Sequence, residues 1–189
     1  DGEEMDFAVT DNLAGGRLMV DYLVGQGHRR LAYVSRPTDR TSMLDRQTGF
    51  VQGLLAHGLS FTSGHLMTLG HPGDAAAQDL PAAVEAVLAL RPRPTAIAFS
   101  NDDLALAAME RCREMGLRIP QDLSIVGYDN TDRCTYGEVP LTSVRQDFFG
   151  MGRVAGDVLC ERLTGKAGSR PIRVFLKPQL VARASVAAK

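Results

Sequence analysis

Short apolar runs alternate with segments of helical periodicity along most of this chain. Runs of four residues, each of strand length, occupy positions 7–10, 31–34, 66–69, 96–99, 123–126 and 141–144. Between these runs, apolar residues recur at helical spacing, as at Leu80, Ala83 and Val87, which predicts helices. Repeated strand–helix–strand units with continuously apolar strands predict an α/β fold, a doubly wound parallel sheet covered by helices on both faces.

Local signals bound the predicted helices. Asp11 and Asn12 read as the N-cap of the first helix, which Gly27 ends. Pro92 and Pro94 stop the third helix before the strand at 96–99. These signals support the predicted order of elements.

The C-terminal part contains a helix and two short strands. The helix is expected at about 148–163, and its apolar face carries Met151, Val154, Ala155, Val158 and Leu159. Positions 172–176 and 180–182 predict strands separated at Pro178, and residues 184–189 are expected to fray. Because an apolar helix face needs a cover, we expect this helix to dock elsewhere on the chain, to swap between chains or to form a dimer.

Composition excludes several classes of protein. With 189 residues, 44% hydrophobic residues and a formal net charge of −1, the chain is ordinary for a soluble domain and offers no charge-driven attraction to nucleic acid. It contains no apolar run long enough to span a membrane. The three cysteines lack C-x-x-C spacing, which fits buried free thiols in a reducing cytoplasm; they are Cys112, Cys134 and Cys160.

Catalytic, cofactor and metal signatures are missing from the sequence. No nucleophile elbow, phosphate-binding loop or dinucleotide fingerprint is present. The histidines show no pair at metal-ligand spacing. We therefore expect no enzyme activity, no cofactor and no metal.

Four polar side chains follow predicted strands or the loops after them. They are Arg46, Asn101, Asp129 and Gln146. Ligands of open parallel sheets bind outside the carboxyl ends of the strands, so these groups are expected to gather at one edge. A guanidinium fork, a carboxylate and two carboxamides suit the adjacent hydroxyls of a sugar, which donate and accept hydrogen bonds.

Structural roles compete with ligand binding at these positions. Asp102 reads mainly as the cap of a helix beginning near Asp103, which leaves Asn101 for a ligand. Asp129 suits ligand binding, with an Asx turn ahead of Asn130 as the alternative. Arg46 lies in the predicted first helical turn, where a cation opposes the helix dipole, and this favours a functional role.

Three further positions are weaker candidates. Phe148 is either a core residue of the last helix, which we favour, or an aromatic wall for a ligand. Ser42 either caps the helix beginning at Met43, which we favour, or hydrogen-bonds a ligand. His71 and Pro72 read as a solvated loop rather than part of a cleft.

Six segments occur here in the order in which LacI/GalR repressors have them. They are residues 11–16, 27–32, 46–50, 99–105, 119–129 and 140–146. The chain thus resembles the effector-binding domain of these repressors. The resemblance implies the fold of type I periplasmic-binding proteins, which has two similar lobes, a cleft between them and three crossing segments as a hinge. It also implies effector contacts at Arg46, Asn101 and Asp129, with Gln146 at a crossing and Phe148 just beyond it.

The resemblance also implies a domain organisation. The chain is expected to be truncated mainly to the second, C-terminal lobe at 1–146, with a helix and strand at 147–177 that would return to a missing first lobe, and a final strand and tail at 178–189. DNA would be contacted only through a headpiece absent from this chain.

A function follows from the same resemblance. We expect a cytoplasmic, homodimeric regulator domain that senses a small-molecule effector, a sugar or a related metabolite, and does not bind membranes. An extracytoplasmic sugar-binding protein of a transport system shares the fold and is the alternative. Arg, Asn and Asp also serve purines, so the residues alone do not name the effector.

Overall fold

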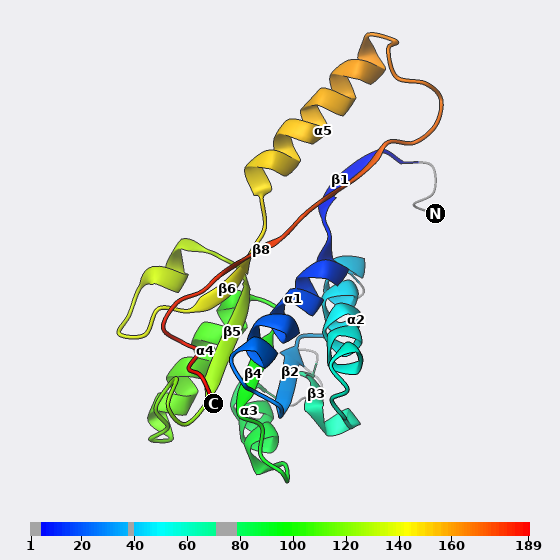
Figure 1. Cartoon of the computed structure of the whole chain (residues 1–189). Helices are drawn as coiled ribbons and strands as arrows, with labels where there is room; N and C mark the ends of the chain where they lie inside the picture. Colours follow the sequence, from blue (N-terminus) through cyan, green and yellow to red (C-terminus); the bar gives the residue numbers. More distant parts are fainter. Residues whose placement is uncertain (1–4, 38–39, 71–78) are drawn as a thin grey trace.

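The computed structural model describes residues 5–37, 40–70 and 79–189, and most of them surround one six-stranded sheet (Figure 1). The strand order is β3-β2-β4-β5-β6-β8. The strands are β2 Leu31–Ser35, β3 Leu66–Thr68, β4 Ala96–Phe99, β5 Ser124–Asp129, β6 Thr142–Arg145 and β8 Gln179–Val181. The first five strands are parallel, and β8 runs antiparallel to β6 at the edge. The predicted doubly wound α/β fold is confirmed, with β8 as an antiparallel addition.

Helices cover both faces of this sheet. The helices are α1 Asn12–Gly25, α2 Thr41–Ala56, α3 Leu80–Ala89 and α4 Asp102–Glu114, with short 3-10 turns at Ser63–His65 and Asp132–Thr135. Tyr33 of β2 packs in the core beneath α1 and α2, and its neighbour Val34 packs in the core beneath α3 and α4. Since strand side chains alternate between the faces, burial on both sides explains the uninterrupted apolar runs.

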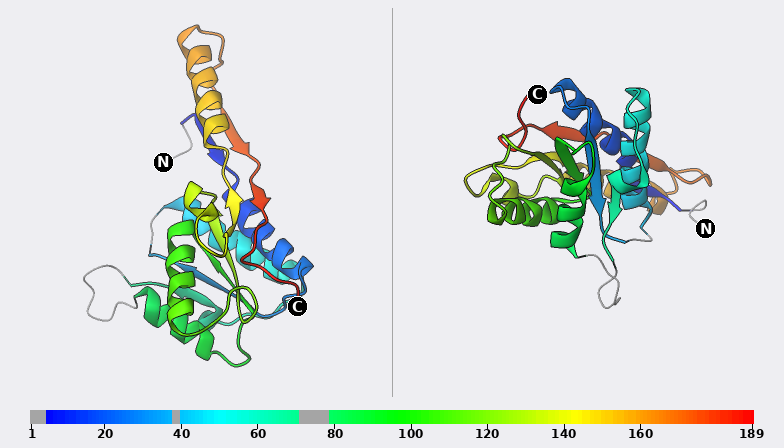
Figure 2. Two further views of the ribbon diagram at one scale, coloured as in Figure 1. Left: turned by 90° about the vertical axis from the view of Figure 1, so that its left-hand side faces the viewer. Right: turned by 90° about the horizontal axis from the view of Figure 1, so that it is seen from below.

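A second, smaller unit projects away from the sheet (Figures 1 and 2). It contains the parallel strands β1 Phe7–Thr10 and β7 Arg173–Leu176 and the helix α5 Phe148–Leu163, which packs along them. The helix therefore docks on its own chain, one of the three arrangements expected for it. The apolar side chains of this helix are only partly covered, because Leu159 is 58% exposed and Leu163 is 79% exposed.

Three neighbouring segments connect the two units. They run from the end of β1 into α1 at residues 10–12, from the end of β6 into α5 at residues 145–148, and from the end of β7 into β8 at residues 176–179. The Asp11 amide donates to the Leu176 carbonyl at 2.9 Å, which places the first segment beside the third. Arg145 pairs with Gln179, which places the second beside the third. The connections thus form a single row.

The C-terminal tail is held against the sheet, so the expectation that residues 184–189 fray is wrong. The Ser185 hydroxyl is buried, donates to the Ile125 carbonyl at 2.6 Å and accepts from the Thr142 amide at 2.8 Å. The Lys189 amide donates to the Gln26 carbonyl at 2.8 Å. The tail pairs with backbone groups at the amino ends of the strands, and satisfying these groups outweighs the usual mobility of a terminus.

The cysteines behave differently from one another. Cys112 and Cys134 are buried free thiols, and burial raises the pKa of each to about 11. Cys160 is free but exposed on α5, so its prediction as a buried residue is wrong. No helix in the described part of the chain is both long and apolar enough to cross a membrane.

The buried imidazole of His28 joins the C-terminal tail to the sheet. His28 contacts the Thr95 hydroxyl at 2.8 Å and the Ala187 carbonyl at 3.0 Å, and burial lowers its pKa below the ordinary value. A histidine whose pKa is lowered by folding contributes stability above its unfolded pKa, and this stability is lost as the pH falls below about 6.5. We expect the free energy of unfolding, measured in urea, to fall from pH 7 to pH 5.5. This decrease should be smaller in His28→Gln than in the unmodified chain. In His57→Gln, which alters an exposed histidine, it should be the same as in the unmodified chain.

Candidate functional site

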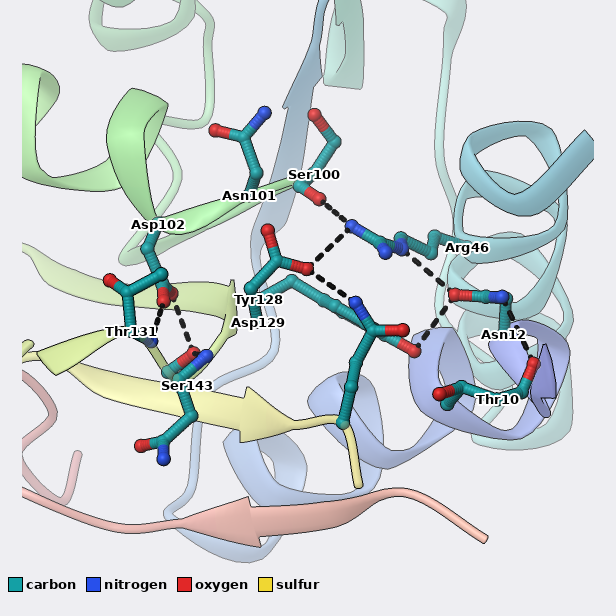
Figure 3. Close-up of polar contacts among 12 residues, drawn as sticks. Thr10, Asn12, Arg46, Ser100, Asn101, Asp102, Tyr128, Asp129, Thr131 and Ser143 are labelled. Carbon is teal, nitrogen blue, oxygen red and sulfur yellow. Dashed lines mark hydrogen bonds and ion pairs between the residues drawn. The ribbon is translucent and has the colours of Figure 1, made fainter. Parts of the chain in front are cut away.

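Polar side chains meet at the carboxyl ends of β4, β5 and β6, where the small unit joins the sheet (Figure 3). Asp129 ends β5, Asn101 follows β4, and Gln146 follows β6. Arg46 reaches this edge from α2. The arrangement brings Arg46, Asp129 and Gln146 into direct contact, and Asn101 lies beside them.

The Arg46 side chain is buried, at 5% exposure, and bonded on several sides. Its Nε donates to Asn12 Oδ1 at 2.9 Å, and its Nη1 donates to the Ser100 carbonyl at 2.6 Å. The same Nη1 lies 3.2 Å from Asp129 Oδ1. The guanidinium carbon lies 3.8 Å from the centroid of the Tyr128 ring, a cation–π contact. The protein thus fixes the orientation of this charge.

Close contact between α1 and α2 places Arg46 at the edge. A Cβ on Gly16 would lie 2.1 Å from the Arg46 carbonyl oxygen, and a Cβ on Gly49 would lie 2.1 Å from the Leu13 carbonyl oxygen. Only glycine allows this approach. Because α2 begins at Thr41, Arg46 lies in its second turn rather than its first, so the argument from the helix dipole does not apply.

Asp129 is shared by two side-chain donors. Its Oδ1 pairs with Arg46 and accepts from Gln146 Nε2 at 2.7 Å. Burial raises the pKa of Asp129 above its ordinary value, and the charge of Arg46 and the bond from Gln146 offset this only in part. The Asx-turn interpretation is wrong, because the amides of Asn130 and Thr131 donate to Ser143 Oγ and Asp102 Oδ2 instead.

The helix cap predicted at Asp102 is formed by Asn101 instead. Helix α4 begins at Asp102, and Asn101 is its N-cap, with Oδ1 accepting from the Leu104 amide at 2.9 Å. Asp102 is buried and accepts from the Ser143 hydroxyl at 2.6 Å and from the Thr131 amide at 2.7 Å. Asp102 therefore holds the loop after Asp129, while Asn101 keeps its amide nitrogen unpaired among the described residues.

Two weaker candidates differ from the favoured interpretations. Phe148 is the first residue of α5 and is 59% exposed, so its assignment to the core is wrong. Arg40 is the N-cap residue of α2, so Ser42 lies inside the first turn and does not cap it. His71 and Pro72 lie outside the described residues.

The arrangement is suited to binding a neutral polar molecule. Arg46 and Asp129 balance in charge, and within the described ranges Asp129 Oδ2 and the Asn101 amide nitrogen are available as acceptor and donor. A planar donor, a carboxylate and a carboxamide can grip adjacent hydroxyls or ring nitrogens of a neutral molecule. No group of three or more His, Cys, Asp or Glu residues in the described part could hold a metal ion.

Comparison with known proteins decides the family. Residues 20–186 match the model described as a periplasmic binding protein-like domain. The HTH-type transcriptional regulator CelR of Thermobifida fusca is 33% identical over 183 residues, and the HTH-type transcriptional repressor PurR of Aliivibrio fischeri is 32% identical over 189 residues. The chain belongs to the family of periplasmic-binding-protein-like domains found in LacI-type regulators.

A solved structure supports this assignment for the domain. The transcriptional regulator CelR–cellobiose complex superposes with a TM-score of 0.85 at 31% identity, covering 98% of this chain and 55% of that one. The matches cover 97% and 98% of this chain but 52% and 54% of the CelR and PurR sequences, so this periplasmic-binding-protein-like domain spans about half the length of these relatives. The relatives are regulators of transcription rather than enzymes.

Sequence reasoning missed three members of this polar cluster. Asn12 was read only as part of a helix cap, although it lies in a segment shared with LacI/GalR repressors. Tyr128 lies beyond the strand predicted at 123–126 and has no predicted role, and the Ser100 contribution is a backbone carbonyl that no side-chain pattern reveals. The segment at 119–129 was the available signal for Tyr128.

Two neighbouring carboxylates are expected to respond differently to mutation. The raised pKa of Asp129 means that its charged form is disfavoured by folding, so stability declines as the pH rises past the ordinary carboxyl range. Asp129→Asn removes this disfavoured charge but keeps an oxygen acceptor for Arg46 and Gln146, so its cost at pH 7 should be smaller than that of Asp102→Leu. Asp102→Leu removes the acceptor of two donors, of which the Ser143 hydroxyl is buried, and should cost about 2–4 kcal/mol. Urea denaturation compares the two variants, and a larger loss in Asp129→Asn would contradict this assignment.

Proposed function

We propose that this domain binds a small polyhydroxylated effector, a sugar or related metabolite, between Arg46, Asp129 and Asn101. The observation that carries the proposal is the ion pair of Arg46 with Asp129 at the carboxyl edge of the sheet. Each partner is held by the protein, yet Asp129 Oδ2 and the Asn101 amide nitrogen remain for a ligand in the described structure. Effector binding would use these preformed groups with little rearrangement.

The outer part of the proposed site comes from the crossing segment and α2. Gln146 holds Asp129 and would present its amide oxygen to the effector. Phe148 is exposed at the start of α5 and would provide an aromatic wall against the apolar face of a sugar ring. Ser42, in the first turn of α2, would contribute a hydroxyl at the rim.

The whole protein would act as a cytoplasmic homodimer that binds DNA through a part outside this chain. The exposed apolar side chains of α5 and β7 include Phe149, Leu163 and Phe175, and oligomer interfaces bury surfaces of this kind. Effector binding would change the relative populations of two arrangements of the domain and thereby the affinity for DNA. The alternative, a transport protein, is not favoured, because the similar proteins are named as regulators.

The effector class can be tested by thermal shift and calorimetry. The panel contains cellobiose, glucose, ribose and the purine bases guanine and hypoxanthine, because the crystallised relative is a cellobiose complex and the residues also suit purines. We expect a sugar to raise the midpoint of unfolding. Stabilisation by a purine base and by none of the sugars would contradict the sugar assignment, but it would leave the assignment of the binding site unchanged.

The site is tested with the same ligand in matched variants. Arg46→Ala and Asp129→Asn should each weaken binding at least about 30-fold, since each removes a hydrogen bond to a charged group. Asp103→Asn is the control, because Asp103 forms an exposed ion pair with Arg133 near the same edge. In the intact regulator, Arg46→Ala should abolish the effector response while DNA binding persists. Unchanged affinity in both site variants would refute the assignment.

A further inference from the structure

Asn12 contacts Arg46 on the side of the guanidinium that is remote from Asp129 (Figure 3). It is the first residue of α1 and is 7% exposed. Its Oδ1 accepts from Arg46 Nε at 2.9 Å and from the Tyr128 hydroxyl at 3.2 Å. Its Nδ2 donates to the Thr10 carbonyl at 3.0 Å. A buried carboxamide thus uses both of its ends.

The direction of the Asn12 amide is fixed by its partners. Arg46 Nε and the Tyr128 hydroxyl are donors on one side, and the Thr10 carbonyl is an acceptor on the other. A flipped amide would place donor against donor and acceptor against acceptor, so only the observed orientation satisfies the buried groups. Asn12 therefore presents a fixed acceptor to the guanidinium.

This acceptor determines how the guanidinium of Arg46 lies. The Nε bond to Asn12 points toward α1, and the Nη1 bond to the Ser100 carbonyl points toward β4. Two bonds from different atoms of a planar group fix its rotation, and the Tyr128 ring supports the plane from one face. Within the described residues, Asn12 Oδ1 is the acceptor of the Nε proton.

We propose that Asn12 is a positioning residue for Arg46, which sets the plane of the guanidinium that the effector meets. Its importance for effector affinity rests on the proposed function, but its action on Arg46 does not. The Thr10 carbonyl, which accepts the hydrogen bond from Asn12, lies where β1 leads into α1. The orientation of Arg46 is thereby tied to the row of segments that joins the two units.

The first experiment needs no effector. The Nε–H signal of Arg46 is observed by ¹⁵N–¹H correlation NMR of the whole 189-residue chain and is assigned by its disappearance in Arg46→Lys. We expect exchange of this proton with water to be at least about tenfold slower than for exposed arginines. Asn12→Leu should abolish this protection, and Asn12→Asp, which keeps an acceptor, should retain it. Asn12→Ser, too short to reach Nε, takes the place of the leucine variant if that variant does not fold.

Ser185→Ala is the matched control for general loss of structure. It removes a buried hydroxyl with two hydrogen bonds at the opposite edge of the sheet. Protection of the Arg46 Nε proton should be unchanged in this variant. Retained protection in Asn12→Leu or Asn12→Ser, or equal loss in Ser185→Ala, would overturn the proposal.

The second experiment measures the effect on affinity with cellobiose as the probe, or with the panel sugar that stabilises the domain most. Asn12→Leu should weaken binding about tenfold, Asn12→Asp should restore most of the affinity, and Ser185→Ala should leave it unchanged. If an Asn12 variant has lost protection of the Arg46 Nε proton but binds the sugar with full affinity, the positioning of Arg46 by Asn12 is not important for binding. If no panel molecule binds the unmodified chain, the proposed function fails, while the exchange experiment still decides the role of Asn12.

Discussion

The burial of one positive charge organises the structure around Arg46. A guanidinium removed from water must be given hydrogen-bond acceptors, or its desolvation would destabilise the fold by several kcal/mol. Asn12 from α1, the Ser100 carbonyl just after β4 and Asp129 from β5 supply them, and Tyr128 covers one face. Elements that are distant in sequence therefore meet at this side chain, in positions that bring hydrogen-bond acceptors to the guanidinium.

The backbone near Asp129 has to be held against its own preference. Asp129 and Asn130 have φ values of 110° and 54°, a region that side-chain-bearing residues rarely adopt and that costs on the order of 1–3 kcal/mol each. Asp102 and Ser143 bind the amides that follow, and Arg183 donates to Asn130 Oδ1 at 2.7 Å. A buried carboxylate thus stabilises the conformation that directs Asp129 toward Arg46.

The pattern of apolar residues predicted the sheet well because each central strand is buried on both faces. Strand β4 occupies 96–99 as predicted, and the groups at the carboxyl edge gather as parallel topology requires. Which of Asn101 and Asp102 caps the helix could not be assigned, because a shift of one residue moves the cap from one to the other, and the partners of Asp102, Thr131 and Ser143, are far away in sequence. Periodicity likewise placed Phe148 on an apolar face but does not reveal how little of that face is covered.

The row of three connecting segments has a mechanical consequence. Three segments that lie side by side resist stretching and shearing, because any such displacement breaks the backbone bond between Asp11 and Leu176 or the strand pairing of Arg145 with Gln179. Bending across the row changes only a few backbone torsions in each segment and leaves those contacts intact. The small unit is therefore expected to move relative to the sheet mainly by rotation about an axis along this row. Gln146 lies on the row itself, so such a rotation would displace it least.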